Sequence, residues 1–271
     1  MPAQERLPSM LELKGICKRY VTQSFTQVAL DSVSLAFRDN EFVAILGPSG
    51  SGKTTMLNVI GGLDHFDSGD LLIDGISTKD FRDRDWDAYR NNRIGFVFQS
   101  YNLIPHQTIL ENVELALTLT GVGHAERRQR AREALEKVGL GEHVNKRPSQ
   151  LSGGQMQRAL LCRAVISDPK LLILDEPANF VDNKFENELY RTLRELNGRM
   201  AIVMVSHDIG TITSVVKEIV CVNRRVHRHH SNVITEEQLR NYDCPIQIVS
   251  HGHIPHTVLE HHPGDCCCDH D

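Results

Sequence analysis

The chain has 271 residues, of which 40% are hydrophobic and 24% are charged, and its formal net charge is -5. This length allows one large domain, or a domain with a subdomain and a tail. The charge excludes a bulk attraction to nucleic acid or to anionic lipid, so a partner has to be recognised at a specific site.

The N-terminal residues contain no apolar signal core, and no apolar run approaches the roughly 18 residues that a membrane-spanning helix needs. The seven cysteines, three of them adjacent, do not suit a disulfide framework and fit a reducing compartment. We therefore expect a cytoplasmic protein that does not span a membrane by itself.

Alternating apolar and polar residues between Leu11 and Phe37 predict antiparallel strands. Residues 42–46 then predict a buried strand that leads into a glycine-rich loop and a helix. Further strands of a mostly parallel core sheet are predicted at residues 94–99, 171–175 and 201–208. Helical patterning from Thr108 to Leu140 predicts a helical insertion between them. The fold class predicted is α/β, with an antiparallel β subdomain beside the parallel core.

The stretch GPSGSGKTT has the spacing of a phosphate-binding loop, and it lies directly between a predicted strand and a predicted helix. In such a loop backbone N–H groups surround phosphates, the lysine adds positive charge, and the threonine can hold Mg²⁺. The candidate nucleotide-binding residues are Gly47, Pro48, Ser49, Gly50, Ser51, Gly52, Lys53, Thr54 and Thr55.

The stretch LLILDEP places two adjacent carboxylates after a buried strand. Asp175 is a candidate for the Mg²⁺ shell, and Glu176 is a candidate for polarising the attacking water. An isolated Asp-Glu pair would be interpreted as merely solvated. Lys53 upstream favours the catalytic interpretation.

The stretch LSGGQMQR forms a second anion-binding turn before a helical run, with Ser152, Gly153, Gly154 and Gln155 as its candidate residues. A single nucleotide-binding chain does not need such a turn for its own ATP. With these motifs in this order, the chain resembles the ATP-binding cassette (ABC) family. The resemblance implies that this turn closes on ATP held by another subunit, so that two cassettes enclose two nucleotides.

The resemblance also assigns roles to single residues. Tyr20 resembles the aromatic residue that stacks on adenine, and Gln99 the glutamine that senses Mg²⁺ and the attacking water. Asp182 resembles the aspartate that signals across the dimer, and His207 the histidine that contacts the γ-phosphate. Residues 178–181 depart from the family pattern at this point, which leaves the detail of cross-dimer signalling open.

The two halves of the chain resemble different branches of the family. Up to about Arg158 the sequence resembles the ATPases of macrolide-export and lipoprotein-release systems, and from about Ala159 those of zinc and manganese uptake. The resemblance implies a MgATP-hydrolysing subunit, in a homodimer or a cassette heterodimer, bound to a separate integral permease at the cytoplasmic face of the membrane. We expect a permease of the first type, because the partner-facing residues lie in the first half.

Three alternatives stay open: zinc or manganese uptake, a soluble cassette ATPase of iron–sulfur assembly, and a hybrid whose halves pack poorly. No nucleic acid partner is expected.

We expect an ATPase domain over residues 1–243, with a helical subdomain at about 100–158, and a tail over residues 244–271. The tail and the segment before it are rich in histidine and cysteine, the preferred ligands of Zn²⁺. The spacing does not match a closed structural zinc site. A flexible tail that binds Zn²⁺ weakly, a metal sensor or donor, and an inert end are the three interpretations. The residues concerned are His227, His229, His230, His251, His253, His256, His261, His262, Cys266, Cys267, Cys268 and His270.

Overall fold

The computed structural model describes residues 9–22, 24–98, 102–118, 120–178, 183–206, 212, 215–229, 246–251 and 254–259. For residues 183–184 and for the two tail segments it describes the backbone alone.

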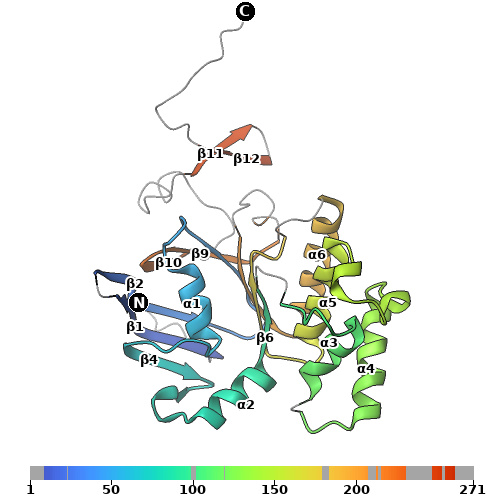
Figure 1. The fold of residues 1–271 in the computed structure, drawn as a ribbon. Helices are drawn as coiled ribbons and strands as arrows, with labels where there is room; N and C mark the ends of the chain where they lie inside the picture. Colours follow the sequence, from blue (N-terminus) through green and yellow to red (C-terminus); the bar gives the residue numbers. More distant parts are fainter. Residues whose placement is uncertain are drawn as a thin grey trace, which may run out of the picture.

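The centre of the fold is a six-stranded sheet in the order β10-β9-β3-β8-β7-β6 (Figure 1). Five of its strands are parallel, and β10 pairs antiparallel with β9. The mostly parallel core predicted from the sequence is confirmed. Its strands are β3 (Phe42–Leu46), β6 (Ile94–Val97), β7 (Leu171–Asp175), β8 (Ala201–Val205), β9 (Glu218–Asn223) and β10 (Arg225–His229).

The core strands are apolar at successive positions because both faces of this sheet are covered. All five residues of β3, of β7 and of β8 are buried. Successive side chains of a strand point to opposite faces, so they enter two separate hydrophobic clusters. Val43, Ile173 and Val203 belong to one cluster, whereas Ala44, Leu172 and Met204 belong to the other.

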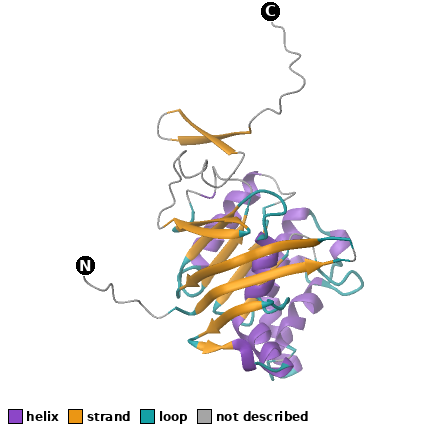
Figure 2. Ribbon diagram, turned by 90° about the vertical axis from the view of Figure 1, so that its left-hand side faces the viewer, coloured by secondary structure: helices purple, strands orange, loops and turns teal. Residues whose placement is uncertain are grey.

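A second, antiparallel sheet covers one face of the core, in the order β2-β1-β4-β5. The strands predicted between Leu11 and Phe37 are confirmed, whereas β4 and β5 were not anticipated. Figure 2 shows this sheet forming one side of the molecule, with helices behind it. Helix α1 (Lys53–Ile60) packs between the two sheets, since its apolar residues share a cluster with both. The strands are β1 (Leu11–Val21), β2 (Thr26–Phe37), β4 (Ser68–Ile73) and β5 (Ile76–Ser77).

The other face of the core sheet is covered by helices, which Figure 1 shows on the side away from the antiparallel sheet. The helical insertion predicted for residues 108–140 is present as α3 (Ile109–Glu114) and α4 (His124–Lys137). Helices α5 (Gly153–Val165) and α6 (Asn183–Leu196) complete this layer, and α2 (Asp83–Arg93) leads into β6. Short 3₁₀ turns lie at Thr78–Asp80, Leu115–Leu117, Gly141–His143 and Pro148–Gln150.

The segment predicted as the tail, residues 244–271, contains two strands, β11 (Ile246–His251) and β12 (Ile254–Leu259). They pair antiparallel and form a sheet of their own.

Across the described ranges, no helix combines the length and the apolar character that a membrane crossing requires.

Candidate functional site

The candidate site lies where the parallel core strands end. Strand β3 runs directly into the glycine-rich loop, and β7 ends at Asp175, so both carboxyl ends meet at one edge of the sheet. The Thr54 hydroxyl, in the first turn of α1, donates a hydrogen bond to Oδ2 of Asp175 at 3.2 Å. The structure therefore brings the two candidate Mg²⁺ ligands together, although they are far apart in the chain.

Glycine is required in this loop because neighbouring backbone comes very close. A Cβ on Gly47 would lie 2.1 Å from the carbonyl oxygen of Val222 in β9. At Gly52, which has φ of 101°, a Cβ would lie 2.3 Å from the carbonyl oxygen of Ala29. Both distances are far inside van der Waals contact. The loop is thus held against two strands and cannot accept side chains at these positions.

The loop presents donors and positive charge at the N-terminus of α1. This helix has no side-chain cap and no acidic residue in its first turn, so no side chain competes with an anion for the positive end of the helix dipole. Lys53 is 7% exposed, and its Nζ donates to the carbonyl oxygens of Gly47 and Pro48 at 2.8 Å each. The Ser51 hydroxyl is buried and has no hydrogen-bond partner among the described residues. These groups fit the phosphates of a nucleotide.

A pocket of about 160 Å³ opens in front of this loop. One wall is the loop with the first turn of α1, and the other is formed by Tyr20, Gln27 and Ala29 of the antiparallel sheet. The Tyr20 side chain is 40% exposed here. The structure thus places the candidate aromatic residue at the same pocket as Gly50, Ser51, Gly52, Lys53, Thr54 and Thr55.

Glu176 follows directly after β7 in a left-handed backbone conformation, with φ of 50°. This conformation is uncommon for a residue with a side chain and costs on the order of 1 kcal/mol. Its backbone N–H donates to the carbonyl oxygen of Val205 at 3.0 Å, which ties it to the end of β8. Strain of this kind is typical of functional sites. Asp175, which precedes it, is buried.

The second anion-binding turn begins α5. The Ser152 hydroxyl accepts from the N–H of Gln155 at 3.3 Å, and the Gln155 side chain accepts from the N–H of Ser152 at 3.0 Å. Gly153 and Gly154 form the first turn, which has no acidic residue. Nε2 of Gln155 lies 3.0 Å from Nε2 of His143. No residue of this turn is among those that line the pocket at the phosphate loop.

Several predicted residues lie outside the part of the chain that the structure describes: Gln99, Asp182, His207, His230, His253, His261, His262, Cys266, Cys267, Cys268 and His270. His251 and His256 are described by their backbone alone, in β11 and β12. His227 and His229 lie in β10. Within the described ranges, no group of three or more His, Cys, Asp or Glu residues could hold a metal ion.

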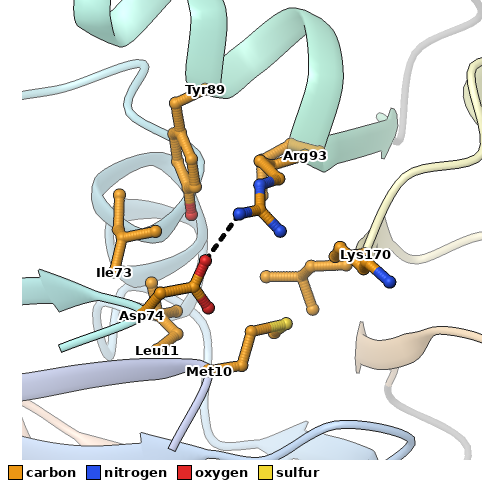
Figure 3. Close-up of a pocket in the computed structure, with 9 residues that line it drawn as sticks. Met10, Leu11, Ile73, Asp74, Tyr89, Arg93 and Lys170 are labelled. Carbon is orange, nitrogen blue, oxygen red and sulfur yellow. Dashed lines mark hydrogen bonds and ion pairs between the residues drawn. The ribbon is translucent and has the colours of Figure 1, made fainter. Parts of the chain in front are cut away.

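A second cavity lies at the opposite, amino ends of β6 and β7 and measures only about 10 Å³ (Figure 3). Asp74 and Arg93 point toward each other beside it and form an ion pair at 2.6 Å. This volume is about that of one water molecule. The cavity is a packing gap under the β4–β5 turn and not a ligand site.

The sequence reasoning missed four residues that organise these elements: Lys18, Asp64, Asn112 and His143. Lys18 contacts His65, Asp64 contacts Tyr20, Asn112 contacts Ile104 and His143 contacts Gln155, and these pairs are between eight and forty-seven positions apart in the chain. No local sequence pattern predicts such contacts.

Comparisons with known proteins agree with this geometry. The family model described as "ABC transporter" matches residues 30–179. An uncharacterized ABC transporter ATP-binding protein of Thermotoga maritima is 42% identical over 207 residues, which cover 76% of this chain and 88% of that protein. The uncharacterized ABC transporter ATP-binding protein MJ0796 of Methanocaldococcus jannaschii is 40% identical over 240 residues, covering 86% and 99%.

The macrolide export ATP-binding/permease protein MacB of Burkholderia pseudomallei is 39% identical over 200 residues, which cover 73% of this chain but 31% of that protein. A solved dimeric structure of the cassette MJ0796, bound to ADP and Pi, has a TM-score of 0.76 at 39% identity, covering 82% of this chain and 98% of that chain. None of these names mentions zinc or manganese.

The family match spans more than half of the chain. The proteins of Thermotoga maritima and Methanocaldococcus jannaschii are matched over most of their own length. The phosphate loop and Asp175–Glu176 lie at the carboxyl ends of core strands, and the second anion-binding turn begins α5. The chain belongs to the ABC transporter family and is an ATP-hydrolysing cassette of that family.

Proposed function

We propose that this cassette works as a dimer that powers a separate integral membrane permease of the macrolide-export or lipoprotein-release type, at the cytoplasmic face of the membrane. The observation that carries the proposal is the separation of two anion-binding helix ends. One, at α1, shares a pocket with Tyr20 and contacts Asp175. The other, at α5, lines no part of that pocket.

The pocket at α1 would hold ATP. The phosphates would lie against the N–H groups at the start of the helix, and Lys53 would exchange the carbonyl oxygens of Gly47 and Pro48 for phosphate oxygens. Thr54 and Asp175 would hold Mg²⁺, which neutralises phosphate charge when it is bound. Glu176 would polarise the attacking water, and Tyr20 would stack on the base.

The second turn would act on the nucleotide of another cassette. Its serine and glutamine satisfy each other, so the N-terminus of α5 is already shaped before any anion arrives. The solved relative MJ0796 is described as a dimer, which supports the same arrangement here. Asp182 would signal across this dimer, while Gln99 and His207 would contact the Mg²⁺ water and the γ-phosphate; these roles rest on the family resemblance.

The permease type is supported by the named relatives. MacB is described as an ATP-binding/permease protein, and this chain corresponds to 31% of its length. We infer that the permease of this system is a separate chain or a separate domain. Zinc or manganese uptake remains the second candidate on the resemblance of residues 159–262 alone, and Zn²⁺ binding by the tail stays a prediction.

The experiment is to trap the Glu176→Gln variant with ATP in membranes of cells that carry the gene, and to identify the integral protein that co-purifies. Glu195→Gln is the matched control, because Glu195 is an exposed residue of α6 away from the pocket. We expect Glu176→Gln alone to retain a permease with few spans and a large extracytoplasmic domain. Recovery of a many-spanning metal permease would overturn the assignment.

A further inference from the structure

Tyr20 lies near the end of β1 and pairs with Gln27 of β2, so both residues reach the pocket from the antiparallel sheet. An exposed aromatic ring on a strand end has considerable freedom. Stacking against a nucleotide base requires the ring to be held at one angle and one height above the phosphate loop. The contacts around Tyr20 supply such a restraint.

The Tyr20 hydroxyl donates a hydrogen bond to Oδ2 of Asp64 at 2.8 Å. It also lies 3.5 Å from the Thr55 hydroxyl in the first turn of α1. Asp64 follows the end of the same helix, where its N–H donates to the carbonyl oxygen of Asn58 at 3.2 Å. The ring is therefore tied to α1 at both ends of the helix.

Lys18 completes the restraint from the other side. Its Nζ donates to Oδ1 of Asp64 at 2.8 Å and to the carbonyl oxygen of His65 at 2.7 Å. The same ammonium lies over the Tyr20 ring, 5.1 Å from its centroid. A cation at this position is attracted by the ring face. Lys18 thus occupies one face of the ring, and Tyr20, which is 40% exposed, also lines the pocket at the phosphate loop.

The pKa shifts of Asp64 and Tyr20 favour the hydrogen bond that Tyr20 donates to Asp64. Burial alone would raise the pKa of Asp64, but the hydrogen bonds from Lys18 and Tyr20 outweigh it and leave the pKa lowered. Burial, together with the Asp64 carboxylate, raises the pKa of Tyr20. Asp64 is therefore an anion at neutral pH, and Tyr20 keeps the proton that it donates.

We propose that Asp64 and Lys18 are positioning residues that fix the Tyr20 ring as the platform for the nucleotide base, at a set distance from the phosphate loop. This rests on the proposed function, in which Tyr20 stacks on adenine. Because Asp64 is hydrogen-bonded to the end of α1, and this helix begins at the phosphate-binding turn, one helix connects the base platform to the phosphate site. This restraint reduces the conformational freedom of the Tyr20 side chain before the base binds, so less conformational entropy is lost on binding.

The test compares ADP with inorganic pyrophosphate, because both engage the phosphate loop but only ADP carries a base. Their dissociation constants would be measured by calorimetry for the whole chain and for Asp64→Asn, Lys18→Met and Tyr20→Ala. Asp70→Asn is the matched control, since Asp70 lies in the same sheet and pairs with Ser77 and Lys79 instead. Tyr20→Phe keeps the ring but lacks the hydroxyl that donates to Asp64, so it breaks the same hydrogen bond and replaces Asp64→Asn in the test if that variant does not fold.

For Asp64→Asn and Lys18→Met we expect ADP to bind about two- to tenfold more weakly, which is the cost of immobilising one free side chain. Pyrophosphate affinity should stay within about twofold, as for a substitution that touches no phosphate contact. KM for ATP should rise by the same factor as the ADP dissociation constant, with kcat little changed. Asp64→Asn should have no further effect once Tyr20 is alanine.

Equal weakening of ADP and pyrophosphate would overturn the proposal, because Asp64 would then brace the phosphate loop itself. An unchanged ADP affinity in Asp64→Asn and Lys18→Met would also overturn it. If Tyr20→Ala binds ADP normally while the protein still hydrolyses ATP, the base platform is wrong and the ATPase assignment stands. Failure of the unaltered chain to bind ADP at all would instead count against the proposed function.

Discussion

Asn112 lies in α3, is fully buried, and closes the preceding loop onto this helix. Its Nδ2 group lies within hydrogen-bond distance of the carbonyl oxygens of Ile104 (3.1 Å), Thr108 (2.9 Å) and Gln107 (3.4 Å). Its Oδ1 accepts from the N–H of Ile104 at 2.6 Å. One side chain therefore satisfies both backbone groups of Ile104 and fixes the turn that begins α3.

Asn112→Asp keeps the shape of this side chain but replaces its donor with an oxygen. The carboxylate can still accept from Ile104, whereas the carbonyl oxygens that faced the amide lose their donor. The Nδ2 group has two hydrogens, so two hydrogen bonds are lost, and a charge is left in a buried site. At about 1 kcal/mol for each bond plus 1 to 3 for the buried polar group, the free energy of unfolding should fall by about 3 to 5 kcal/mol.

The assay is urea unfolding of the nucleotide-free protein at pH 7 and at pH 4.5. Burial raises the pKa of the new carboxyl in the folded state, so the destabilisation should shrink at the lower pH, where a protonated carboxyl can again donate. Asn92→Asp, at an exposed position of α2, is the control and should change the free energy by less than about 0.5 kcal/mol. A loss below about 1 kcal/mol for Asn112→Asp would refute the reasoning.

Three further predictions concern the site and its surroundings. Glu176→Gln should lower ATP turnover by about 10² to 10⁴ while ATP stays bound, measured with radiolabelled nucleotide; normal turnover would remove Glu176 as the base. Gly47→Ala should lower turnover about 100-fold, because its Cβ would lie 2.1 Å from the carbonyl oxygen of Val222 and must displace the loop; an active variant would show that the loop relaxes. Burial raises the pKa of Cys162 to about 12, so the unfolded thiol ionises first, and stability should fall as pH rises above about 9. Cys162→Ala should flatten this alkaline fall in urea unfolding, and identical slopes would contradict the burial argument.

The sequence predicted those parts of the fold whose signals are local. A short, contiguous stretch of sequence predicts each of three elements, and the structure contains all three: the strand Phe42–Leu46, the phosphate loop and the strand that ends in Asp175. Strand β4 was missed because its sequence, SGDLLI, begins with turn-forming residues and has only one buried position. It becomes a strand by pairing with β1, a contact that no local pattern predicts.

The candidate site was predicted as a set of residues and not as an arrangement. The sequence named Thr54 and Asp175 separately as candidate Mg²⁺ ligands, and the structure joins them by a direct hydrogen bond of 3.2 Å. The ties from Tyr20 to Asp64 and from Gln155 to His143 could not be predicted, because they depend on how separate elements pack. Hydrogen bonds between side chains have no periodicity for a sequence to display.

The strand order of the core sheet bears on how this chain can be divided. Among the strands that the structure describes, β3 pairs only with β8 and β9, and β6 pairs only with β7. Every strand that the first half contributes to this sheet therefore has neighbours from the second half alone. A chain cut near Arg158 would give two fragments whose core strands each have unpaired backbone N–H and C=O groups. The strands of each fragment would need the strands of the other as hydrogen-bonding partners. The core sheet is therefore built jointly by both halves of the chain.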